Sequence, residues 1–366
     1  MDKPLVSVVM TVFNGERLLR EAVESVLGQS FPDFEFVIVD DGSTDSAPSL
    51  LDYYAAIDPR VRVWHQENKG LVKSLSRGCA LAEGKYIARM DADDLTVKDR
   101  LMWQVEYMEA NPEVGVLGGA MQVMDDAGKP LAIWQYPSQS GQIKDALLRH
   151  RRSIAHATVV MRKEVFVSVG GYRSIFTGAE DYDLWLRMAE RCELANLQAV
   201  LYKYRLHPDQ KFYRNVQRQV SCGLAAQAAA LIRRNGLPDP LNSVKEITPA
   251  VLAALGITEM AVEKRVIARY RDRIILLREL SRDLPILPLV NHMLAKLAES
   301  KHVRPPVAAG VWGVAARAYW SRGKVLKAVA AAARAFLVHP ALPMDIVRRE
   351  FGRLLRWAGL RARLPR

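Results

Sequence analysis

Cysteine is scarce in this 366-residue chain. Cys79, Cys192 and Cys222 are too few and too scattered for a disulfide framework, and none belongs to a zinc-binding Cys-x-x-Cys pair. No run of about 18 uncharged apolar residues occurs, so we expect no membrane-spanning helix. The first residues lack the charged start, apolar core and cleavage site of a secretory leader. We therefore expect a protein of a reducing compartment.

Glycine-rich phosphate loops are also missing. Gly-x-Gly-x-x-Gly does not follow the first predicted strand, and Gly-x-x-x-x-Gly-Lys-Ser/Thr appears nowhere in the sequence. Glycine and proline are used at ordinary frequency, with 22 and 18 residues, which excludes collagen-like and low-complexity chains. If the protein binds a nucleotide, its phosphates must be held in another way.

Charge is distributed unevenly along the chain. Residues 1–210 carry 24 Lys and Arg against 30 Asp and Glu, a net charge of −6, whereas residues 211–366 carry 28 against 10, a net charge of +18. This change predicts a domain boundary near residue 210. A basic half is typical of proteins that meet an anionic surface, such as phospholipid headgroups or nucleic acid, and equally of helices with solvated arginine-rich faces.

The acidic half alternates between strand and helix patterns. Apolar and β-branched runs predict strands, and apolar residues at helical spacing predict the helices between them, with strands at 5–13, 34–39, 61–65 and 86–90 and helices at 16–29 and 72–82. Strand, helix and strand with short connections form a βαβ unit, whose strands are parallel and buried. We therefore predict an α/β fold with ligands beyond the carboxyl ends of its strands.

Polar residues follow these predicted strands. Those after the first, second and fourth strands are Thr11, Asp40, Asp41, Asp91, Asp93 and Asp94. Acids that converge at one edge repel one another unless a cation or a hydrogen-bonding ligand lies between them. Asp-Ala-Asp at 91–93 suits Mg²⁺ or Mn²⁺, which would bridge a diphosphate, while Asp40 and Asp41 suit a base imide or a ribose hydroxyl. Asp94 suits a cap for the element that follows.

Several motifs together resemble glycosyltransferase family 2. They are VSVVMTVFNGERLLREAVESVLGQSFPDFEFVIVDDGSTD (6–45), ENKGLVKSLSRGCALAEGKYIARMDADD (67–94), HATVVMRKEVFVSVGGYR (156–173), EDYDLWLRMAE (180–190) and YRLHPDQ (204–210). The resemblance covers about residues 4–210. It implies a GT-A fold, with a mostly parallel central sheet flanked by helices. Residues 211–366 lie outside these motifs, and their own pattern, described below, predicts an all-helical region.

The resemblance also implies a donor site. Thr11, Val12, Asp40 and Asp41 would hold the uracil and ribose of a UDP-sugar. Phe13, which is often tyrosine in relatives, lacks the hydroxyl but keeps a stacking surface.

A metal site is implied beside it. Asp93 would ligate Mn²⁺ or Mg²⁺, and Asp91 would contact the metal, ribose or sugar. Arg89 would pair with Asp91 or meet phosphate. His207 resembles a position that contacts the metal or diphosphate, although a lone histidine is also an ordinary loop residue. Ser76 stands where relatives commonly show asparagine, so its contact toward the sugar or ribose stays open.

The acid pair Glu180-Asp181 opens a predicted helix. An acid there complements the helix dipole, but inverting transfer also needs a carboxylate that takes the proton of the acceptor hydroxyl. The resemblance implies that Asp181 is this base and that Glu180 orients the acceptor or the base. Trp185 is either a floor for the acceptor or core, and core is favoured. His156 would begin a strand, HATVVMR, on the acceptor side, without the proline that often follows this histidine in relatives.

The basic half predicts helices. Apolar residues recur at helical spacing over 213–300, and 305–340 reads as a helical hairpin joined at Ser321 to Gly323. The segment 351–366 is basic and amphipathic, which suits an anionic membrane surface or docking on the hairpin. Nucleic acid is disfavoured because no known binding module accompanies the arginines.

These observations predict an inverting, metal-dependent glycosyltransferase that moves a sugar from a nucleotide diphosphate donor, UDP, to a hydroxyl of a glycan or lipid-linked glycan. We expect it in the cytoplasm or at the inner face of the cytoplasmic membrane. A sugar-phosphate nucleotidyltransferase is an alternative, but it would need a glycine-rich loop where this chain has Thr-Val-Phe-Asn-Gly. A catalytically idle membrane-binding or scaffold-binding protein is another, against which the many mutually repelling acids argue.

Overall fold

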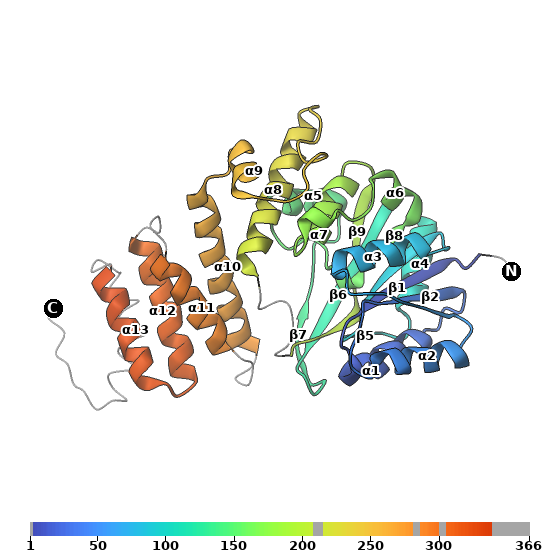
Figure 1. Ribbon diagram of the computed structural model, residues 1–366, viewed down its shortest axis with the longest axis horizontal. Coiled ribbons are helices and arrows are strands. Elements are labelled where there is room, and N and C mark those ends of the chain that lie inside the picture. The colour runs from blue at the N-terminus through green and yellow to red at the C-terminus, as the bar shows by residue number, and fades with distance from the viewer. Residues whose placement is uncertain (1–2, 208–214, 281–285, 300–304, 339–366) are drawn as a thin grey trace. The chain divides into compact units, whose positions relative to one another are not determined.

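The computed structural model describes residues 3–207, 215–280, 286–299 and 305–338. Packing divides the chain into two compact units, Met1–Ile257 and Thr258–Arg366 (Figure 1). The first unit contains a mixed sheet with helices on both faces, and the described part of the second unit is helical.

The sheet has nine strands in the order β3-β2-β1-β4-β8-β6-β9-β5, with β7 paired to β6. Strands β1 to β4 run parallel, and β8 joins them to β6 through two antiparallel pairings. The bounds are β1 Val6–Val12, β2 Phe34–Asp40, β3 Val61–His65, β4 Tyr86–Asp91, β5 Leu95–Thr96, β6 Val114–Met124, β7 Pro130–Trp134, β8 Val160–Arg162 and β9 Glu193–Arg205.

Helices cover both faces because side chains alternate along the strands. Met10 of β1 joins the apolar cluster that includes Val23 of α1, whereas Val9 points toward α3. Gly78 permits this close approach, since a Cβ there would lie 2.6 Å from the Val9 side chain. Figure 1 shows α1 and α3 on opposite sides of the sheet. The helices are α1 Glu16–Leu27, α2 Ala47–Ile57, α3 Leu71–Leu81, α4 Arg100–Ala110, α5 Ser140–Leu148, α6 Lys163–Ser168, α7 Glu180–Met188, α8 Val216–Arg234 and α9 Pro249–Ala254.

The predicted βαβ pattern is confirmed, with each predicted strand and helix in the first 90 residues present within a few residues of its expected bounds. The strand predicted to begin at His156 is wrong at its start. Residues His156–Thr158 form a single 3₁₀ turn, η1, and β8 begins only at Val160. Thr158 explains the turn, because both its backbone N–H and its hydroxyl donate to the Ala155 carbonyl.

Packing places the division of the chain after Ile257, whereas charge and motifs place it near residue 210. The difference arises because α8 packs against α5, α7 and the short 3₁₀ turn η2, Ser174–Phe176, burying small residues such as Ala225 and Ala229. Charge counts cannot detect this packing, because the residues that α8 buries are uncharged. The basic region therefore contributes α8 and α9 to the first unit.

The second unit contains α10 Glu259–Leu280, α11 Ile286–Glu299, α12 Pro305–Ser321 and α13 Val325–Val338. Helices α12 and α13 pack on each other and coincide with the hairpin predicted at 305–340. Gly323, at a φ of 69°, makes the turn between them. The segment 351–366 lies outside the described residues. Within the described ranges, no helix has the length and apolarity needed to cross a bilayer.

Candidate active site

A cavity of about 370 Å³ opens where β1, β2 and β4 end, and we call it the strand-end cavity. The sheet register brings these ends together, since Thr11 lies beside Asp91, and Val12 lies beside Asp40. Among the residues predicted from the sequence, those that line the cavity are Thr11, Val12, Phe13, Asp41, Asp91, Asp93 and His207. The phenyl ring of Phe13 is 48% exposed and offers a stacking surface beside the cavity.

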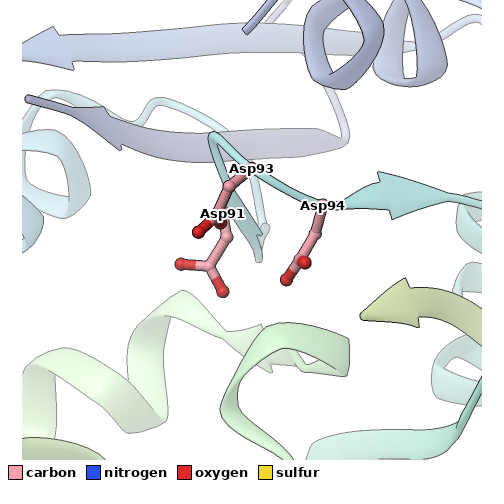
Figure 2. Close-up of side chains that lie close together, drawn as sticks. All are labelled: Asp91, Asp93 and Asp94. Carbon is pink, nitrogen blue, oxygen red and sulfur yellow. The ribbon is translucent and has the colours of Figure 1, made fainter. Parts of the chain in front are cut away.

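Three carboxylates gather at the end of β4. Asp91, Asp93 and Asp94 each offer an oxygen within 4.8 Å of the others, and Figure 2 shows their side chains around one turn of the chain. Burial, and then the charges of Asp93 and Asp91, raise the pKa of Asp94 well above its ordinary value. Carboxylates this close repel one another, so the cluster favours a cation or a proton among them.

The sequence suggested that Asp94 caps the element that follows, but that element is the short strand β5, and Asp94 bonds to another strand instead. Its side chain is fully buried, and its Oδ1 accepts a 2.7 Å hydrogen bond from the backbone N–H of Arg205. Its Oδ2 is buried without a partner among the described residues. This carboxylate thus joins the loop after β4 to the end of β9 and leaves one oxygen for another group.

His207 is brought to the same cluster by β9. Its Nε2 lies 2.9 Å from Asp93 Oδ2, and the residue is 8% exposed. Its Nδ1 is also buried without a partner among the described residues. His207 lies in the loop after β9 but is not an ordinary surface residue, because its ring is buried against an acid of the cavity.

Arg89 is buried beneath the acid cluster and forms an ion pair with Asp91. The sequence analysis gave Arg89 two alternative partners, Asp91 and a phosphate, and the structure shows the pair with Asp91. Arg100 adds to this layer by donating to the carbonyls of Arg89 and Val159 at 3.0 and 3.1 Å. Two buried arginines, Arg89 and Arg100, therefore lie next to the acids of the cavity.

Asp41 lines the cavity but is already strongly hydrogen-bonded. Its Oδ1 accepts from Gln66 Nε2 and from the Lys69 N–H, both at 2.8 Å, and its Oδ2 accepts from the Gly70 N–H at 2.9 Å. Burial by itself would raise the pKa of Asp41, but these hydrogen bonds, with one from Ser74, lower it below its ordinary value. Asp41 is therefore an ionised acceptor with a fixed orientation.

Asp40 and Ser76 lie apart from the cavity lining. Asp40 is 2% exposed, and its oxygens accept from the Ser43 N–H at 3.0 Å and face His65 Nδ1 at 2.8 Å. Ser76 donates to the Val72 carbonyl of its own helix at 2.8 Å. Both side chains therefore form hydrogen bonds within the protein and do not line the strand-end cavity.

The second acid pair begins α7. Glu180 is 7% exposed, and its Oε2 accepts from the Gly178 N–H at 2.5 Å. Burial, and then the charge of Asp181, raise the pKa of Glu180 to about 7. Asp181 accepts from the Tyr182 N–H at 2.7 Å. Two adjacent acids, one of which holds its proton near neutral pH, suit proton transfer.

His156 and Trp185 lie below this acid pair as packed neighbours. Trp185 is 1% exposed, which confirms the core reading, and its ring centroid lies 5.9 Å from that of His156. His156 Nε2 lies 2.7 Å from the Tyr172 hydroxyl. Burial, and then the charge of Arg89, lower the pKa of His156 well below its ordinary value, so the imidazole is neutral at pH 7.

Arg17 and Tyr204 are among the cavity residues that the sequence analysis did not single out. Arg17, from the first turn of α1, lines the cavity and forms a 2.7 Å ion pair with Asp126 in the turn between β6 and β7. Tyr204 of β9 lines it as well. No local signal marks either residue, because a charged residue at a helix start and an aromatic residue in a strand are common.

Comparison with known proteins decides the family. The family model for glycosyl transferase family 2 matches residues 7–170. The putative glycosyltransferase EpsE of Bacillus subtilis is 36% identical over 212 residues, covering 56% of this chain and 74% of that protein. The chain belongs to glycosyltransferase family 2. The amylovoran biosynthesis glycosyltransferase AmsE of Erwinia amylovora is 34% identical over 207 residues, covering 56% of this chain and 77% of that protein.

Solved structures confirm the GT-A fold of this family 2 enzyme. Staphylococcus aureus TarS 1-349 in complex with UDP-GlcNAc superposes with a TM-score of 0.53 at 15% identity, covering 90% of each chain. The mannosyltransferase PcManGT of Pyrobaculum calidifontis, in complex with GDP-Man and Mn²⁺, gives 0.52 at 20% identity, covering 89% of this chain and 88% of that one. Membership of glycosyltransferase family 2 makes the protein a glycosyltransferase rather than a sugar-phosphate nucleotidyltransferase.

Proposed function

We propose that this glycosyltransferase is inverting and metal-dependent, and that it transfers a sugar from a UDP-sugar to a hydroxyl of a glycan. One observation carries the proposal: Asp91 and Asp93 of the acid cluster line the same cavity as Thr11, Phe13 and Asp41. A nucleoside bound along the β1 end would therefore direct its diphosphate toward Asp91 and Asp93. Two related folds have been solved with nucleotide sugars, UDP-GlcNAc and GDP-Man, and the second also holds Mn²⁺.

The residues of the cluster fit a divalent cation. Carboxylate oxygens and an imidazole are ligands that Mn²⁺ accepts, and Asp94 Oδ2 and His207 Nδ1 are buried without partners among the described residues. Asp93, Asp91 and His207 would hold the ion. When bound, the ion supplies positive charge that neutralises the departing diphosphate.

The remaining chemistry falls to the acids of α7. Asp181 accepts the proton of the acceptor hydroxyl while the oxygen of that hydroxyl attacks the anomeric carbon. The bond from that carbon to the diphosphate oxygen breaks in the same displacement. Glu180, with a pKa of about 7, orients the acceptor or Asp181. His156, which is neutral and packed against Trp185, shapes the acceptor side.

The experiment is calorimetric titration of the protein with UDP, with and without Mn²⁺. Asp93→Ala should lower the Mn²⁺-dependent affinity for UDP at least about tenfold, because it removes a charge-assisted contact. Asp33→Ala is the matched control, since Asp33 is an exposed acid that precedes β2 at the opposite edge of the sheet. If both variants bind UDP as the wild type does, the proposed metal site is wrong.

We further propose a lipid-linked glycan as the acceptor, reached at the inner face of the cytoplasmic membrane. The support is the net charge of +18 over residues 211–366, which attracts anionic headgroups. Among the relatives, AmsE is named for amylovoran biosynthesis and WbnJ of Escherichia coli, 30% identical over 207 residues, for O-antigen biosynthesis. Sedimentation with phosphatidylglycerol vesicles tests the membrane contact, and no binding above that to neutral phosphatidylcholine vesicles would contradict it.

A further inference from the structure

Helix α7, which begins with Glu180 and Asp181, carries Asp183 and Arg187 farther along, and Glu190 lies just beyond the end of the helix at Met188. Asp183 and Arg187 are four residues apart, so they project to the same side of the helix. Asp181 precedes Asp183 by two residues and projects about 160° away from it, because each residue turns an α-helix by about 100°. Contacts that hold Asp183 and Arg187 therefore also set the direction in which Asp181 projects.

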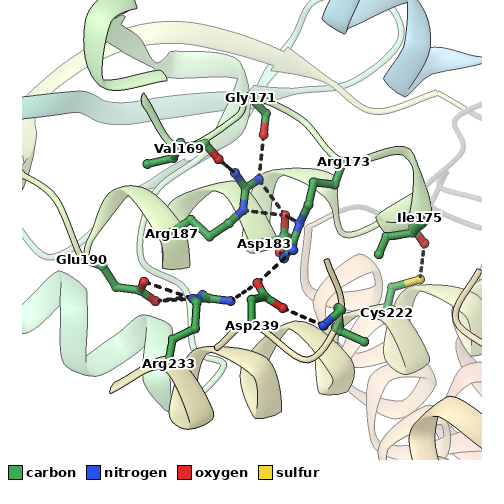
Figure 3. Close-up of polar contacts among 11 residues, drawn as sticks. Val169, Gly171, Arg173, Ile175, Asp183, Arg187, Glu190, Cys222, Arg233 and Asp239 are labelled. Carbon is green, nitrogen blue, oxygen red and sulfur yellow. Dashed lines mark hydrogen bonds and ion pairs between the residues drawn. The ribbon is translucent and has the colours of Figure 1, made fainter. Parts of the chain in front are cut away.

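Asp183 lies at the centre of the polar contacts that hold this face (Figure 3). It is fully buried and forms an ion pair with Arg173, and its Oδ2 accepts from Arg187 Nη2 at 2.7 Å. Arg187 also donates to the carbonyls of Val169 and Gly171 at 2.5 and 2.7 Å. The helix is thereby tied to the turn that precedes it, but two arginines share one carboxylate.

Asp239 supplies the missing charge from a segment distant in the sequence. It follows α8, and its Oδ2 accepts from Arg173 Nη1 at 2.9 Å and from Arg233 Nη1 at 2.7 Å. Arg233 in turn forms a 2.8 Å ion pair with Glu190 at the end of α7. Asp239 Oδ1 accepts from the Leu241 N–H at 2.8 Å, which fixes the carboxylate.

The complete network contains three arginines and three acids, so its formal charge is balanced. Its members are Arg173, Arg187, Arg233, Asp183, Glu190 and Asp239. Asp239 links the two parts of this network, because it pairs with Arg173, which holds Asp183, and with Arg233, which holds Glu190. It lies outside residues 7–170, which the family model matches.

We propose that Asp239 is a positioning residue for glycosyl transfer, which holds the charged face of α7 so that Asp181 faces the acceptor. The proposal rests on the proposed role of Asp181 as base. Charge-assisted hydrogen bonds are directional, so losing Asp239 removes one acid partner from Arg173 and one from Arg233 and breaks the link between Asp183 and Glu190. A shift of about 1 Å in a reacting group lowers a rate by about 100-fold.

The experiment compares Asp239→Asn with Glu35→Gln in transfer assays. Glu35 is a buried acid paired with Arg62 and hydrogen-bonded to Ser7, remote from α7, so its variant controls for lost stability. Both variants should unfold at lower urea concentration. Asp239→Asn should also lower kcat about 10-fold to 100-fold with donor KM within twofold of the wild type, while Glu35→Gln keeps its kcat. Asp239→Glu, which retains the charge, should recover part of kcat.

Two outcomes overturn the proposal. One is an unchanged kcat in folded Asp239→Asn, and the other is an equal loss of kcat in Asp239→Asn and Glu35→Gln. Asp181→Asn is measured in parallel to separate this failure from failure of the proposed function. If Asp181→Asn keeps its turnover, the assignment of the base is wrong. If Asp181→Asn is inactive and Asp239→Asn is fully active, the positioning proposal alone is wrong.

Discussion

Glu180→Gln should change the pH dependence of stability. Glu180 is 7% exposed, and its pKa is raised from an ordinary 4.5 to about 7 by burial and by Asp181. The folded protein therefore holds this proton more tightly than the unfolded chain does. Stability from this source is complete below the unfolded pKa and is lost as the pH rises through the folded pKa, between about 4.5 and about 7.

The size of the effect follows from these two values. Between about pH 5.5 and about pH 8, a carboxyl that shifts from 4.5 to about 7 on folding loses about 2 kcal/mol of stabilising free energy. Glutamine stays neutral throughout, and its side-chain carbonyl can still accept the hydrogen bond from Gly178. The variant should therefore gain about 2 kcal/mol relative to the wild type over this interval.

Urea unfolding of both proteins at several pH values measures this difference. Glu164→Gln is the matched control, because it makes the same exchange at an exposed glutamate at the start of α6. If the difference between Glu180→Gln and the wild type is constant with pH, Glu180 does not hold a raised pKa and our account of the acid pair is wrong.

Three further predictions test the proposed site. Asp181→Asn should keep the affinity for UDP within twofold and lower transfer at least about 100-fold, because only the base is removed; an active variant contradicts this. If Arg17 contacts the diphosphate, Arg17→Gln should weaken UDP binding about threefold to tenfold. Asp126→Asn should instead strengthen it about twofold, by freeing Arg17 from an exposed ion pair worth about 0.5 kcal/mol. Titrations that change UDP affinity in the same direction for both variants would argue against this contact. Removing residues 351–366 should reduce sedimentation with phosphatidylglycerol vesicles, and equal sedimentation would return this segment to docking on the hairpin.

The α/β fold was predictable because its signals are local. The apolar run before Thr11 and the helical spacing from Glu16 each depend on neighbouring residues, and the structure contains both elements. The turn at His156 was not predictable in the same way. Its residues suit a strand, but the hydrogen bonds that Thr158 makes to Ala155 close a 3₁₀ turn instead.

The site was predicted in part. Asp41, Asp91 and Asp93 line the strand-end cavity, since the order of the parallel strands brings the ends of β1, β2 and β4 together. His207 reaches the same cavity from the end of β9. Asp40, by contrast, stands one position earlier at the end of β2 and therefore points to the other face of the sheet, where Ser43 and His65 occupy it.

The sequence by itself determined the family, the sheet and the acids at its edge, because periodicity and motif spacing are properties of short stretches of chain. Only the tertiary structure decided which acids share a cavity, that Glu180 retains a proton near pH 7, and that Asp239 supports α7. These properties depend on burial and on contacts between residues as distant as Arg173 and Asp239. No local pattern encodes such contacts, since they form only when separate elements pack together.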